Sequence, residues 1–115
     1  MRLLRAGVLT VLALTTCTAC SSSVEVQNKS STQVRKLTVS VGGNDLQVKE
    51  LNPGERAVVR YKPRTDSSVA VTFQTSDDPV IKSCEGNFYV TDPSTDHFLV
   101  TVNEDKSCLV LRKPE

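Results

Sequence analysis

The four cysteines are the residues of this chain with the most distinctive chemistry. Cys17 and Cys20 are separated by only two residues, whereas Cys84 and Cys108 lie far apart. A close pair can form a disulfide, bind a metal or mark a site of covalent attachment. Metal binding is disfavoured, because His97 is the only histidine and no pair with zinc-finger spacing follows the first two cysteines. The second pair also lacks the C-x-x-C spacing of a redox site.

The first residues have the composition of an export signal. Met1 to Arg5 is short and basic, and Ala6 to Thr16 carries no charge. This order is typical of a secretory signal peptide. A membrane-spanning helix would need about 20 apolar residues, and polar residues from Thr15 onward end the apolar run too early. The sequence therefore predicts an exported chain whose signal is removed.

The end of this segment, LTTCTACSSS, resembles the lipobox of bacterial lipoproteins, in which small residues precede a cysteine. Cys20 follows Ala19, and Cys17 has Leu14 three positions before it. The resemblance implies that residues 1–19 are a signal peptide and that Cys20, or alternatively Cys17, is acylated. Residues 20–23 would then be the anchor and a short tether. Because no aspartate follows either cysteine, the resemblance implies an outer-membrane lipoprotein; plain secretion after Ala19 is the alternative.

Composition limits the classes of partner. Without residues 1–19, basic and acidic residues nearly balance, so bulk charge gives no reason to expect nucleic acid as a partner. There is no tryptophan, and aromatic residues make up 4% of the chain. In an exported chain the remaining cysteines, Cys84 and Cys108, read as a disulfide. Closing that loop would stabilise the fold by roughly 3 kcal/mol. No cofactor, metal or small-molecule substrate is expected.

Alternating apolar and polar residues recur along residues 24–115 and predict strands. The runs lie at 24–26, 37–41, 46–48, 57–61, 69–73, 80–84, 88–90, 98–102 and 107–111, with Gly, Pro, Asn and Asp between them. No segment shows a helical stripe. We therefore expect an all-β domain, a small antiparallel sandwich of about seven strands. The turn LNPGE and its following strand resemble those of small immunoglobulin-like bacterial modules. Residues 98–102 and 107–111 should form a hairpin.

A run of basic residues is the first candidate binding surface. Arg56, Arg60, Lys62 and Arg64 are all even-numbered, so in one regular strand they share a face with Val58. Such a stripe suits an acidic protein, lipid phosphate or polymer. It also suits the solvated face of an edge strand, where charge blocks aggregation.

An aromatic pair and a set of acids complete the candidates. Tyr89, in the predicted loop 85–89, could project as a binding anchor. The acids Asp77, Asp78, Asp92, Asp96, Glu104 and Asp105 lie in predicted turns, where aspartate is favoured for local hydrogen bonds. The sequence contains no Gly-x-Ser-x-Gly motif whose serine His97 could activate. We expect His97 at the exposed start of a strand.

These observations favour a non-catalytic lipoprotein on the periplasmic face of the outer membrane. It would bind a protein partner, as an accessory subunit of an envelope secretion or assembly machine. An inhibitor or immunity protein against a periplasmic toxin or a lysozyme-type hydrolase is the alternative, since both roles need only a shaped surface. A small hydrolase would depend on His97, the only candidate base.

Overall fold

Eight strands make up the described part of the protein. The structure is a computed structural model that describes residues 22–90 and 96–113, with only the backbone at 87–89. The strands are β1 (Ser22–Asn28), β2 (Val34–Val41), β3 (Asn44–Val48), β4 (Arg56–Tyr61), β5 (Ser67–Thr75), β6 (Asp78–Val90), β7 (His97–Val102) and β8 (Cys108–Arg112). In these ranges no helix is long and apolar enough to cross a membrane.

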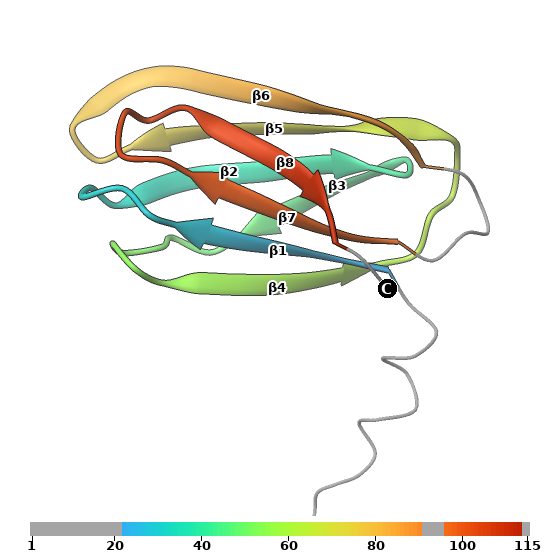
Figure 1. The fold of residues 1–115 in the computed structure, drawn as a ribbon. Helices are drawn as coiled ribbons and strands as arrows, with labels where there is room; N and C mark the ends of the chain where they lie inside the picture. Colours follow the sequence, from blue (N-terminus) through green and yellow to red (C-terminus); the bar gives the residue numbers. More distant parts are fainter. Residues whose placement is uncertain (1–21, 91–95, 114–115) are drawn as a thin grey trace, which may run out of the picture.

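The strands form two four-stranded sheets packed face to face (Figure 1). One has the order β4-β1-β7-β8 and the other β3-β2-β5-β6. The predicted all-β sandwich is confirmed, with eight strands where about seven were expected. In an immunoglobulin constant domain the second and third strands lie in different sheets, whereas here the β2–β3 hairpin stays within one sheet. Strands β1 and β7 run parallel, and the other paired neighbours are antiparallel.

Strand β1 begins earlier than the sequence suggested. Ser22 and Ser23, predicted to belong to a tether, lie in the strand and are 1% and 7% exposed. Ser22 lies opposite Tyr61, and its hydroxyl accepts a hydrogen bond from the Asp96 amide at 3.0 Å. Only Ser21 therefore separates Cys20 from the folded domain. The predictions for residues 1–19 and for the anchor cysteines lie outside the described residues.

Valine dominates the core between the sheets. The inward positions of each strand alternate with outward ones, as period-two patterning requires. The largest fully buried side chains are Phe73, Phe98, Leu37 and Leu51, and ten valines are as deeply buried. Since β-branched side chains pack well on a pleated surface, a chain with few aromatic residues still fills the space between its sheets.

A bulge near the start of β2 adds one residue to the strand and changes which positions face the core. The register with β5 shifts between Arg35 and Thr38. Val34 and Leu37 are three positions apart, yet both are fully buried, because the bulge contributes one additional residue between them. Lys36, at the bulge, has a φ of 51°, in the left-handed region. Beyond it Leu37, Val39 and Val41 alternate inward as predicted.

The predicted hairpin and disulfide are both confirmed. Strands β7 and β8 pair from Phe98 opposite Arg112 to Val102 opposite Cys108. The disulfide joins Cys84 of β6 to Cys108 of β8, with 5.8 Å between their Cα atoms. Strands β6 and β8 are edge strands of different sheets. The disulfide therefore closes one side of the sandwich covalently.

The two ends of the sandwich are formed by different connections. We call the end where β1 starts the near end; it also holds the β2–β3 turn, the β4–β5 connection at 62–66 and the last residues of β8. We call the other end, with the connections at 29–33, 49–55, 76–77 and 103–107, the far end. At the near end the Arg64 amide donates to the Gly42 carbonyl at 2.7 Å. A Cβ on Gly42, whose φ is +58°, would lie 3.0 Å from the Pro63 Cα, so this close approach requires glycine.

Candidate functional site

The predicted basic stripe divides between a strand and a connection. Arg56, Val58 and Arg60 point outward from β4, an edge strand, and are exposed as predicted. Lys62 and Arg64 are also exposed but lie beyond the end of β4, in the β4–β5 connection. The prediction that one regular strand carries all four cations is therefore wrong for these two.

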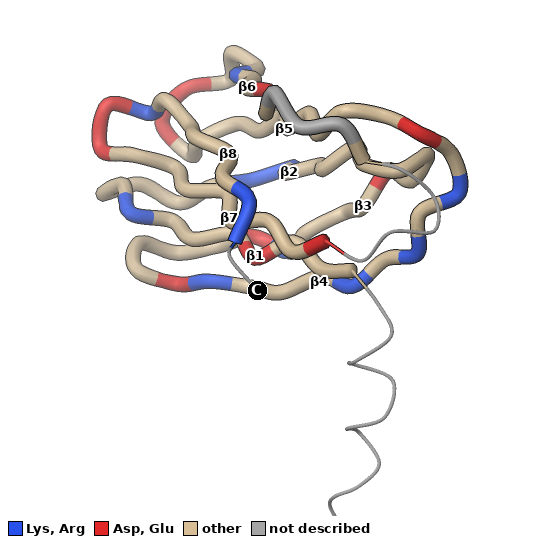
Figure 2. Tube along the Cα trace, turned by 45° about the vertical axis from the view of Figure 1, so that its right-hand side comes forward, with Lys and Arg blue, Asp and Glu red and all other residues tan. Residues whose placement is uncertain are grey.

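Proline explains where the strand stops. Pro63 has no amide hydrogen, so it cannot donate to a ladder, and strands end at such residues. Its side chain is buried against Gly42, which leaves Lys62 and Arg64 on the outer surface to either side. The Asn44 side-chain amide donates to the Lys62 carbonyl at 2.9 Å. The connection is thus held in place while its two cations face outward. Figure 2 shows a series of blue segments, which mark Lys and Arg, where the chain leaves β4 for β5.

Arg56 belongs to an ion-pair network on the neighbouring strand. Its guanidinium lies 3.3 Å from a carboxylate oxygen of Glu25 in β1, and the Lys113 ammonium lies 3.0 Å from the other. The Gln27 side chain donates to Glu25 at 3.1 Å. The hydrogen bonds from Gln27 and Lys113, together with both positive charges, hold the pKa of Glu25 below its usual value. Arg56 therefore stabilises the surface of its sheet. Of the four cations, it is the least available to bind a partner.

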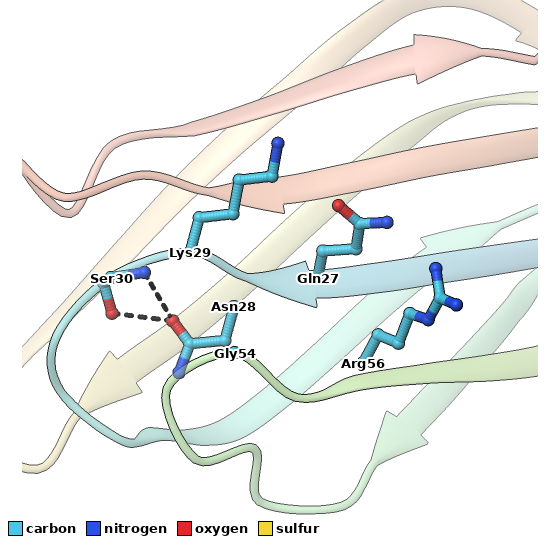
Figure 3. A pocket seen from close by; sticks show the side chains of 6 residues that line it. All are labelled: Gln27, Asn28, Lys29, Ser30, Gly54 and Arg56. Atoms are coloured by element: carbon cyan, nitrogen blue, oxygen red, sulfur yellow. Dashed lines mark hydrogen bonds between the residues drawn. The ribbon is translucent and has the colours of Figure 1, made fainter.

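A shallow hollow adjoins this network at the far end. It has a volume of about 610 Å³ and is lined by Gln27, Asn28, Lys29, Ser30, Gly54 and Arg56 (Figure 3). The Asn28 side chain donates to the Thr32 and Leu51 carbonyls at 2.8 and 3.0 Å. Its oxygen accepts from the amide and the hydroxyl of Ser30 at 3.0 and 2.7 Å. Asn28 thus fixes the corner between strands and has no hydrogen-bonding group left for a ligand.

His97 lies at the start of β7 as predicted, but it is half-buried. Its Nδ1 is 2.7 Å from the Ser23 hydroxyl across the parallel β1–β7 pair. Sequence patterns did not predict this contact, because parallel pairing joins segments that are distant in the chain. Asp96 pairs instead with Arg112, at 3.5 Å. Ser23 is 7% exposed, so this contact joins β1 to β7 at a largely buried position.

The acids at the far end pair with nearby residues. Asp77 lies 2.6 Å from the Lys106 ammonium, and Asp78 lies 2.8 Å from that of Lys82. Asp105 accepts hydrogen bonds from the hydroxyl and amide of Ser107. These contacts lower the pKa of all three carboxyl groups. Within residues 22–90 and 96–113, no three His, Cys, Asp or Glu side chains are arranged to hold a metal. Asp92 lies outside the described residues.

The predicted aromatic loop at 85–89 is part of a strand. Strand β6 runs without interruption from Asp78 to Val90, with Gly86 buried opposite Val69 of β5. The Gly-Asn pair that suggested a turn instead lies at a bulge, because the step from Gly86 to Val90 in β6 is matched by the shorter step from Val69 to Ser67 in β5. The side chain of Tyr89, a candidate binding anchor, lies outside the described residues.

Comparison with known proteins supports the fold alone. No protein-family model and no curated protein sequence matches this chain. A protein from Eubacterium rectale, whose structure was solved by NMR, is similar with a TM-score of 0.55. The likeness covers 84% of this chain and 91% of the other, at 13% sequence identity. Proteins that share so little sequence can share a sandwich without sharing a function.

Proposed function

We propose that this protein is a non-catalytic lipoprotein, anchored through Cys20 in the outer membrane and facing the periplasm. It binds a protein partner there, as an accessory subunit of an envelope secretion or assembly machine. The observation that carries the proposal is the start of β1 at Ser22, two residues after Cys20 of the lipobox-like segment. The anchor would therefore lie directly beside the first strand of the domain.

The disulfide supports an exported location. Disulfides form and persist in oxidising compartments such as the bacterial periplasm. The Cys84–Cys108 bond joins two edge strands of different sheets, which is the role of a structural bond. A small domain with a valine core gains stability from such a link.

The outer face of the β4-β1-β7-β8 sheet is the best surface for a protein partner. Val58, Leu109 and Leu111 on this sheet are 55%, 51% and 45% exposed. Arg56 and Arg60 lie on either side of Val58 along β4. Exposed apolar side chains bordered by polar and charged ones are typical of protein contact surfaces.

The first test is the mass of the protein purified from membranes. The proposal predicts acyl groups on Cys20, lost in Cys20→Ala and kept in Cys17→Ala. Crosslinking of the acylated protein should then capture a large envelope component. The variant Leu111→Asp should lose this capture, whereas Thr72→Asp, at an exposed position on the other sheet, should keep it. An unacylated protein would contradict the anchor. Capture of a soluble toxin or hydrolase alone would replace the accessory role with inhibition.

A further inference from the structure

Three cations at the near end have no ionic partner in the described structure. Arg60, Lys62 and Arg64, which we call the basic rim, are all exposed. None forms an ion pair with any residue in 22–90 or 96–113. In contrast, Arg56 pairs with Glu25 and Lys106 pairs with Asp77. The rim therefore offers positive charge that no residue in 22–90 or 96–113 neutralises through an ion pair.

The backbone holds the rim at a defined place. The Arg64 and Thr65 amides both donate to the Gly42 carbonyl, at 2.7 and 3.2 Å. The Lys62 carbonyl accepts from the Asn44 side chain, and Pro63 between the two cations is buried. Lys62 and Arg64 lie on either side of this buried proline and are both exposed, so their side chains face outward together.

The position of the rim is fixed relative to the proposed anchor. Ser22 pairs with Tyr61 and Ser23 with Arg60, so β4 ends where β1 starts (Figure 1). Cys20 is two residues before Ser22, and an extended chain spans at most about 3.6 Å per residue. The Cα of Cys20 thus lies within about 7 Å of that of Ser22. If Cys17 is the anchor, the limit is about 18 Å.

Charge is distributed unequally between the two ends. Among the described residues, the near end carries Arg60, Lys62, Arg64, Arg112 and Lys113 against Asp45, Asp66 and Asp96. The far-end connections and the strand ends beside them carry Glu50, Glu55, Asp77, Asp78, Glu104 and Asp105, against Lys29, Arg35, Lys36, Lys49, Arg56 and Lys106. Figure 2 shows red segments in the turns that join β5 to β6 and β7 to β8. An anionic surface would therefore attract the near end more strongly than the far end, where the charges balance.

We propose that the basic rim binds the phosphate groups of anionic lipids in the leaflet that receives the acyl chains. The sandwich then stands with its near end on the membrane and its far end toward the periplasm. The inference rests on the proposed lipid anchor, which brings the rim to the headgroups. Each Lys or Arg beside an anionic surface strengthens attraction about fivefold, so three together contribute about a hundredfold.

Lys62 is a natural probe for this contact. The acylated protein is purified from membranes, its acylation is verified by mass, and it is reconstituted in vesicles. One set contains phosphatidylethanolamine alone and the other a mixture with phosphatidylglycerol. Modification of lysines by an amine-reactive reagent is followed by mass spectrometry. We expect Lys62 to react at least about fivefold more slowly on the anionic vesicles, and high salt should abolish the difference. Lys29 and Lys49, at the far end, should react equally on both.

Charge variants that retain the probe sharpen the test. Arg60→Gln/Arg64→Gln should lose most of the protection of Lys62. The matched control Arg35→Gln/Lys36→Gln removes two exposed cations from β2 and should keep it. Equal reactivity of Lys62 on the two vesicles, in a protein shown to be acylated, would overturn the lipid contact while leaving the anchor standing. Protection that appears only with envelope extract would assign the rim to a protein instead. An unacylated protein would overturn both proposals.

Discussion

At the scale of single residues, Asn28 is the side chain on which the far end most depends. It is 1% exposed and makes four hydrogen bonds, which join β1 to the segments at Ser30, Thr32 and Leu51. Asn28→Ala would leave buried backbone groups without partners. We expect it to lower the free energy of unfolding by about 2–4 kcal/mol, measured by urea denaturation. The exposed Asn52→Ala should change it by less than about 0.5 kcal/mol, and equal effects would contradict this role.

Glu25 should make stability depend on pH. Its pKa is lowered in the folded protein by Gln27, Lys113 and Arg56, so the unfolded state binds its proton more readily. The contribution is present above the unfolded pKa of about 4.3 and is lost as pH falls through the lower folded value. Glu25→Gln should therefore cost about 1 kcal/mol at neutral pH, and the difference from wild type should shrink as the solution is acidified. Urea denaturation at several pH values measures this.

Glu104 supplies the control for this experiment. It lies exposed in the β7–β8 turn, so Glu104→Gln should match wild type at every pH. A Glu25→Gln variant that differs from wild type by the same amount at low and neutral pH would contradict the assigned network.

At the scale of elements, the bulge in β2 makes two neighbouring positions respond in opposite ways. Lys36 has a left-handed backbone, which costs residues with a Cβ about 1–2 kcal/mol. Lys36→Gly should therefore be more stable than Lys36→Ala by about 1 kcal/mol. At Arg35, whose φ is not positive, glycine should instead be less stable than alanine by about 0.5–1 kcal/mol. Thermal denaturation of the four variants provides the comparison. The same sign at both positions would contradict the described bulge.

The strands that the sequence predicted well are those with local signals. Residues 98–102 and 107–111 alternate on both sides of a polar turn, so their hairpin followed from pattern alone. Two errors have local causes that the sequence contained. Pro63 ends β4 before Lys62 and Arg64 can join its face, and Gly86 lies inside β6 beside a bulge rather than in a turn.

At the scale of the whole molecule, sequence patterns could not predict which strands lie side by side, and the candidate site depends on that arrangement. Alternation assigns residues to faces within a strand, but it does not say which strands become neighbours. The pairing of Ser23 with both Arg60 and His97 depends on long-range contacts. The location of the basic rim beside the start of β1 depends on the same contacts, and so does the excess of positive charge at the near end.

The central place of β1 has a consequence for the order in which the protein is completed. One neighbour of β1 is β4, and the other is β7, whose His97 comes 74 positions after Ser23. A chain delivered to its compartment from the N-terminus onward would present β1 first and its second partner almost last. One side of β1 therefore stays unpaired until nearly all of the chain has arrived. Under the proposed lipidation, the enzymes that process Cys20 would meet it while β1 still lacks its second partner.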